Sequence, residues 1–131
     1  MNITWRLAKE LILSEVKQND FLAPTSKYGR KIVLVPPSTS NSRRFMGMES
    51  YNVQIGKNKF IDVPISMIEN LFNASLKNNN EYTSYIFHAI YPGLAGPKGT
   101  PCYISTVGQI FEKAGLVIKI GVNKYWFKTF L

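Results

Sequence analysis

Cysteine and histidine are almost absent from this chain, which contains one residue of each, Cys102 and His88. A single cysteine excludes a disulfide within the chain and a zinc cluster built on cysteines. The lack of a disulfide framework fits a reducing compartment, so we expect a cytoplasmic protein. We also expect neither a bound metal nor another cofactor.

Acidic residues are scarce as well: 8 aspartates and glutamates stand against 16 lysines and arginines, giving a formal net charge of +8. Such an excess of positive charge favours polyanionic partners such as DNA, RNA or an anionic membrane surface. No apolar run approaches the roughly 18 residues that a membrane span needs, and the first residues lack the pattern of a signal peptide. A membrane partner is therefore not expected.

Groupings of catalytic residues are missing too. The triplet Glu15-Val16-Lys17 lies on a predicted helix with no aspartate before it, and Asp62 has no second carboxylate at a convincing ligand spacing. His88 and Cys102 belong to no recognisable local signature of a nucleophile and its base. The sequence therefore favours a binding protein over an enzyme.

What is present fits a single globular domain of 131 residues, with 45% hydrophobic and 18% charged residues. Residues 1–63 predict a helix capped by Thr4, then a buried β-branched strand at residues 31–35. Residues 50–55 and 59–63 alternate in polarity around a Gly-Lys-Asn turn and predict a β-hairpin.

A basic stretch free of acidic residues runs from Asp20 to Glu49. Its cations, all candidate nucleic-acid contacts, are Lys27, Arg30, Lys31, Arg43 and Arg44. The last two follow a loop rich in small hydroxyls at residues 38–42. This loop suits contact with phosphate through its donors, and it equally suits a mobile surface loop.

Residues 64–131 predict three helices and a second hairpin. Ser66 and Glu69 form a capping-box pattern at the first helix, and a second helix spans about residues 81–91. The stretch 92–101 is rich in proline and glycine and predicts an irregular loop. Thr106 and Gln109 form a second capping box, starting a helix that ends at Gly115.

The second hairpin is basic and aromatic, with strands at residues 116–120 and 124–130. In an alternating strand Tyr125 and Phe127 share one face, which is most often part of the core. Trp126 then lies on the other face, where stacking on a nucleic-acid base is an alternative to packing. Taken together, the expected fold is α+β: an N-terminal helix and short strands, then a helical segment with a C-terminal β-hairpin.

The order helix, helix, loop, helix, hairpin in residues 66–131 resembles the winged-helix superfamily, in which the third helix enters the major groove of DNA. The resemblance implies that the third helix presents Ser105, Thr106, Gln109 and Lys113 to DNA, with Gln109 able to bond adenine. It also implies that three lysines of the hairpin lie near phosphates: Lys119, Lys124 and Lys128. Lys98, in the loop before the helix, is a further candidate nucleic-acid contact.

The leading hypothesis is a double-stranded DNA-binding protein or DNA-recognition module, of a regulator, a mobile element or a restriction system. An RNA or single-strand binder that uses the aromatic hairpin is an alternative. A protein-interaction factor, such as an inhibitor with a basic docking face, is another, and a homodimer is compatible with each.

Overall fold

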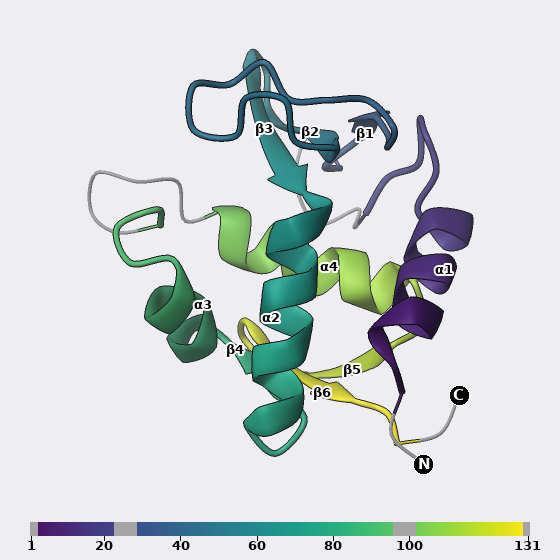
Figure 1. The fold of residues 1–131 in the computed structure, drawn as a ribbon, viewed down its shortest axis with the longest axis vertical. Coiled ribbons are helices and arrows are strands. Elements are labelled where there is room, and N and C mark those ends of the chain that lie inside the picture. Colours follow the sequence, from purple (N-terminus) through teal and green to yellow (C-terminus); the bar gives the residue numbers. More distant parts are fainter. Residues whose placement is uncertain (1–2, 23–28, 96–101, 130–131) are drawn as a thin grey trace.

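The computed structural model describes residues 3–22, 29–95 and 102–129, and these form an α+β fold of four helices and two antiparallel three-stranded sheets (Figure 1). The helices are α1 (Trp5–Glu15), α2 (Ile65–Lys77), α3 (Ser84–Ile90) and α4 (Cys102–Lys113). The N-terminal sheet has the order β1-β2-β3, with β1 (Ile32–Leu34), β2 (Ser50–Gly56) and β3 (Lys59–Pro64). The C-terminal sheet has the order β4-β6-β5, with β4 (Glu81–Thr83), β5 (Val117–Gly121) and β6 (Lys124–Phe127). The expected fold class is thus confirmed.

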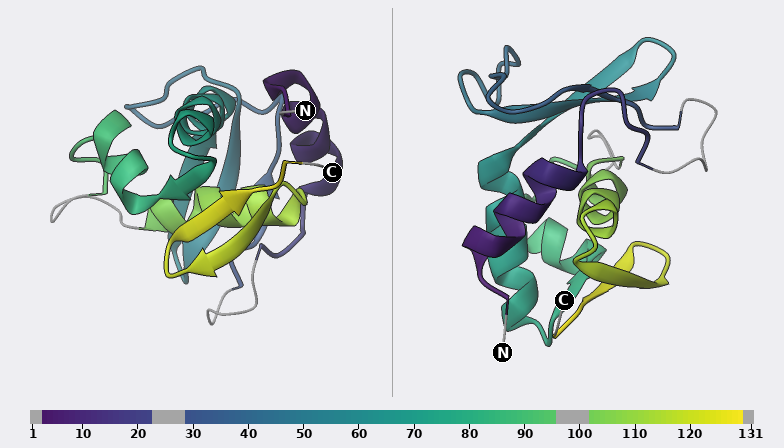
Figure 2. Two further views of the ribbon diagram at one scale, coloured as in Figure 1. Left: turned by 90° about the horizontal axis from the view of Figure 1, so that it is seen from below. Right: turned by 90° about the vertical axis from the view of Figure 1, so that its right-hand side faces the viewer.

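The two sheets lie at opposite ends of the molecule, with α1, α2 and α4 between them (Figures 1 and 2). Buried side chains from both halves of the chain form one hydrophobic cluster. The cluster includes Ile12 of α1, Leu71 of α2, Phe111 of α4 and Phe127 of β6, each at most 1% exposed. A single core therefore fixes α4 relative to both sheets.

The N-terminal sheet turns its apolar face toward the helices. Tyr51 pairs with Val63 and Val53 pairs with Ile61, and the Tyr51 hydroxyl donates to the carbonyl of Ile12 at 3.2 Å. The hairpin of β2 and β3 is confirmed. The strand predicted at residues 31–35 forms β1, and its expected burial holds only in part, since Ile32 is fully buried and Leu34 is 44% exposed.

The start of α2 differs from the predicted capping box. Strand β3 runs directly into the helix, so Pro64 is the N-cap and makes no side-chain capping bond. The amide of Ile65 donates to the carbonyl of Glu49 at 2.9 Å instead. Ser66 lies inside the first turn, so the capping-box prediction for Ser66 and Glu69 is wrong.

The predicted helix at about residues 81–91 is divided into β4 and α3. Glu81 and Tyr82 pair with Trp126 and Tyr125 of β6, and Thr83 then caps α3 by accepting from the amide of Ile86. Pairing with a strand more than 40 residues further along the chain overrides the local helical pattern.

Helix α4 begins at Cys102, one turn before the predicted capping box, so Thr106 lies in mid-helix and caps nothing. The predicted end is confirmed: Gly115 has φ +78°, and the amide of Leu116 donates to the carbonyl of Phe111 at 3.0 Å. Together with the bond from the amide of Gly115 to the carbonyl of Glu112, this bond forms a Schellman motif, which turns the chain directly into β5.

Candidate nucleic-acid interface

Helix α4 is covered on one side by β6 and on another by the segment before β1. Tyr125 of β6 packs on Gly108 so closely that a Cβ at Gly108 would lie 2.2 Å from the ring. From the other direction, Arg30 reaches Ser105 and Gln109 of α4. In the right-hand view of Figure 2, α4 lies between hairpin β5–β6 and the segment leading into β1.

Arg30 makes the most specific polar contact of this region. Its Nη1 donates to Ser105 Oγ at 2.6 Å and to Gln109 Oε1 at 3.0 Å, bridging 75 and 79 residues of chain. Ser105 in turn donates to the carbonyl of Cys102 at 3.4 Å. The bonds to Arg30 connect a predicted nucleic-acid contact of the basic stretch with two α4 residues predicted to face DNA.

Two residues expected to face DNA are buried. Gln109 is 8% exposed and Thr106 is fully buried, with no hydrogen-bond partner for Oγ1 among the described residues. Helix α4 starts one turn earlier than predicted. Its first turn is packed against other elements, since the ring of Tyr103 contacts the rings of Phe45 and Phe87. The expectation that Thr106 and Gln109 present free side chains to DNA is therefore wrong.

Hairpin β5–β6 carries exposed lysines. Lys119 pairs with Tyr125 in the sheet register, on the face that Tyr125 turns toward α4, and it is exposed. Lys124 is also exposed, and its Nζ lies 3.9 Å from Glu81 Oε2. Lys113 and Lys128 are half-buried. The alternation expected here is confirmed: Tyr125 and Phe127 are buried, and Trp126 is half-buried on the other face.

Charges of both signs lie around Tyr125. Burial raises the pKa of its phenol, the negative charge of Glu112 raises it further, and the positive charge of Arg30 lowers it. Arg30 and Glu112 thus both lie near this ring, at the junction of α4 and β6. The positive potential contributed by Arg30 and Lys119 is therefore opposed by one carboxylate.

Arg43 and Arg44 are exposed, but on a loop that lies apart from hairpin β5–β6. In the right-hand view of Figure 2, the loop between β1 and β2 points to the side opposite the hairpin. The hydroxyls of this loop are engaged internally: Ser40 Oγ donates to Asp62 Oδ2 at 2.7 Å and lies 2.8 Å from Ser42 Oγ. Asn52 Nδ2 also donates to Asp62, at 2.8 Å.

The turn between β2 and β3 is a basic segment that the sequence pattern identified as a turn and not as a contact. Lys57 and Lys59 are exposed there. In the right-hand view of Figure 2, this turn projects to the same side of α4 as hairpin β5–β6. The two lysines in this short turn are the sequence feature that could have indicated a contact with nucleic acid. Lys31 is half-buried beside Arg30, while Lys27 and Lys98 lie outside the described residues.

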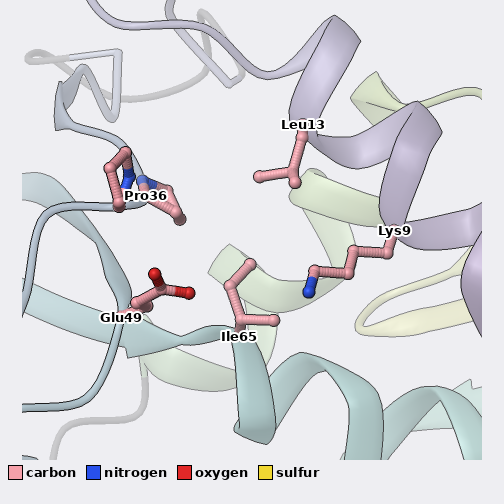
Figure 3. A pocket seen from close by; sticks show the side chains of 6 residues that line it. Lys9, Leu13, Pro36, Glu49 and Ile65 are labelled. Atoms are coloured by element: carbon pink, nitrogen blue, oxygen red, sulfur yellow. The ribbon is translucent and has the colours of Figure 1, made fainter.

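A separate cavity of about 210 Å³ lies between α1 and the residues before β2. Figure 3 shows Lys9 and Glu49 extending into it from opposite sides, with Ile65 between them and with Leu13 and Pro36 across the cavity from Ile65. Its walls carry one charge of each sign, so they offer no concentrated positive potential to a polyanion.

The described residues bring no three metal-ligating side chains of histidine, cysteine, aspartate or glutamate together. In the same part of the chain, no helix is both long enough and apolar enough to cross a membrane. Comparison with known proteins finds no matching family model, no matching curated protein and no matching solved structure.

Proposed function

We propose that the protein binds double-stranded DNA on the side of α4 that lies between hairpin β5–β6 and the turn of β2 and β3. The observation that carries the proposal is that cations from three distant segments lie on α4 or toward one side of it. Arg30 is bonded to α4, Lys119 lies in register with the tyrosine that packs on α4, and Lys57 lies in a turn that projects to the same side.

The arrangement of residues 65–127 supports the winged-helix resemblance as part of this proposal. Helices α2, α3 and α4 follow one another, and α4 passes through the Gly115 turn straight into a hairpin. In a winged helix the corresponding helix and hairpin approach DNA together. The exposed lysines of both hairpins would then contact phosphates, which set affinity and orientation without reading sequence.

The test is fluorescence anisotropy of a labelled random duplex across a salt series, with two double variants that lose equal charge. Lys57→Ala/Lys119→Ala removes cations from the proposed face, and Arg43→Ala/Arg44→Ala removes two from the loop on the other side. Each lost phosphate contact lowers the log–log salt slope by about 1. We expect a decrease of about 2 for the first variant and less than 1 for the second.

Three outcomes would contradict the proposal in different ways. Failure of the unaltered protein to bind duplex at low salt would rule out DNA binding. Tighter binding to a single strand than to the duplex would favour the single-strand alternative. A larger loss in the Arg43→Ala/Arg44→Ala variant would move the interface to the loop between β1 and β2.

A second candidate, binding to another protein, is favoured by apolar side chains on hairpin β5–β6. Ile118 and Ile120 are 50% and 49% exposed, and Val122 is 91% exposed. Interfaces with apolar cores depend on salt much less than phosphate contacts do. Absence of duplex binding at low salt would make this the better candidate.

A further inference from the structure

Arg30 has an unusual backbone conformation. Its φ is +51°, next to Gly29 at +63°, and every other non-glycine residue with positive φ among the described residues is an asparagine. Asparagine tolerates the left-handed region, whereas a long side chain such as arginine seldom adopts it. Backbone bonds hold the turn in place: the amide of Leu22 donates to the carbonyl of Arg30, and that of Ile32 donates to Asp20.

The turn directs the guanidinium onto α4, where two acceptors occupy one nitrogen. Nη1 has two hydrogens, and Ser105 Oγ and Gln109 Oε1 accept one each. Within the described residues, Nε and Nη2 have no partner, and the side chain is half-buried. The edge formed by Nε and Nη2 therefore keeps two parallel N–H donors, on a guanidinium already held in one orientation.

Two parallel donors on a rigid plane match the O6 and N7 acceptors of guanine in the major groove. A phosphate also accepts from such an edge, but flexible surface lysines serve that purpose without being fixed in position. Arg30 is held by two hydrogen bonds to α4, the helix whose side the proposed function turns toward DNA. Its orientation therefore favours a base edge over the DNA backbone.

We infer that Arg30 is the sequence-reading residue of this protein and recognises a guanine, with Ser105 and Gln109 acting as positioning residues for its guanidinium. The inference rests on the proposed DNA binding and reverses the expected roles. Gln109, expected to bond adenine, orients an arginine instead, and Arg30, expected only as one of several basic contacts to nucleic acid, reads a base.

The experiment is selection of bound sequences from a random duplex library, carried out with the unaltered protein and three single variants. Arg30→Lys keeps the charge but loses the fixed two-donor edge, and Gln109→Ala removes one support of that edge. Lys31→Ala is the matched control, since it removes the neighbouring cation. Circular dichroism and thermal melting verify that each variant is folded.

We expect the unaltered protein to select a site containing a guanine, with about ten-fold or greater preference over the other bases at that position. Arg30→Lys and Gln109→Ala should lose most of this preference while binding random duplex nearly as well. Lys31→Ala should weaken binding to all sequences and keep the preference. Replacing the selected guanine by 7-deazaguanine, which lacks the N7 acceptor, should weaken the unaltered protein and leave Arg30→Lys unchanged.

Each opposite result overturns the inference. Duplex binding without a guanine preference, or with a preference that Arg30→Lys retains, would leave DNA binding intact and remove the role of Arg30. Loss of preference in Gln109→Ala alone would return base reading to Gln109. Absence of duplex binding by the unaltered protein would remove both the inference and the proposed function.

Discussion

The two halves of the chain carry different kinds of positive charge. All four arginines lie within residues 1–63: Arg6, Arg30, Arg43 and Arg44. Every cation after residue 63 is a lysine. Arginine offers a planar set of donors suited to two-point recognition, whereas lysine acts as a mobile point charge. Helix α4, in the C-terminal half, is therefore bonded by an arginine that the N-terminal half supplies, Arg30.

The two sheets differ in the side chains that they pack against the helices. The inner face of the C-terminal sheet is aromatic, with Tyr82, Tyr125 and Phe127 at most 1% exposed, and the ring centroids of Phe127 and Phe111 lie 4.9 Å apart. The N-terminal sheet packs mainly aliphatic side chains inward and carries the polar group of Ser40, Asn52 and Asp62 beside it. The C-terminal sheet is thus held by close contacts between aromatic rings. The N-terminal sheet is held by aliphatic packing and polar bonds, and the segments next to it carry Arg30, Arg43 and Arg44.

The sharpest test of this contrast compares one glycine from each half. Gly108→Ala would force a Cβ to within 2.2 Å of the buried Tyr125 ring, whereas Gly56→Ala meets nothing nearer than 3.4 Å. Overpacking of this kind exceeds the gain in helix propensity, so we expect Gly108→Ala to lower the free energy of unfolding by about 2 kcal/mol. Gly56→Ala should change it by less than about 0.5 kcal/mol. Urea denaturation measures both, and equal effects would refute the contrast.

Alkaline pH should affect buried tyrosines of both sheets and of α4. Burial raises the pKa of Tyr51 and of Tyr82 above 10.0, and it raises that of Tyr103 to about 12. Above pH 10 the unfolded chain loses these protons while the folded chain keeps them, so the free energy of unfolding falls as pH rises toward 12.

Tyr82→Phe separates this effect from ordinary packing. At pH 7 the variant should lose about 1 kcal/mol, because the hydroxyl donates to the carbonyl of Ile104 at 2.7 Å. Its stability should then fall less steeply above pH 10 than that of the unaltered protein. Urea denaturation at several pH values measures the slope, and parallel curves would contradict the assignment to Tyr82.

The smallest expected effect concerns the carboxylate on α4. Glu112→Gln removes an exposed negative charge that acts on Tyr125 together with Arg30, so duplex affinity should rise about two- to three-fold at low salt. Glu69→Gln, on α2, is the matched control and should change affinity less. An equal gain from both variants would indicate an effect of net charge and not of this face.

Local patterns predicted the elements whose determinants are close together in sequence. The hairpin of β2 and β3 follows from alternation around its turn, and the end of α4 follows from Gly115. The start of α4 and the existence of β4 depend on distant partners: Tyr103 packs on Phe45, and Tyr82 pairs with Tyr125. No local pattern indicates such contacts, so these boundaries were misassigned.

In the candidate interface, too, local features were predictable from sequence and contacts between distant residues were not. Exposed lysines of the second hairpin could be identified from composition and alternation. The orientation of Arg30 depends on a left-handed turn and on two acceptors 75 and 79 residues away, which no spacing rule connects. The winged-helix resemblance implied that Gln109 faces DNA, whereas tertiary packing decides its exposure and leaves it 8% exposed.

Strand β6 lies at the centre of the C-terminal sheet although it follows both of its neighbours in the chain. While the protein is being synthesised, β4 and β5 have no partner in this sheet until Lys124–Phe127 has emerged. Tyr82 and Phe111 also lack their aromatic neighbours on β6 until then. The C-terminal half therefore cannot complete its fold gradually from the N-terminal side, and its nascent chain is exposed to aggregation and proteolysis until the last strand pairs.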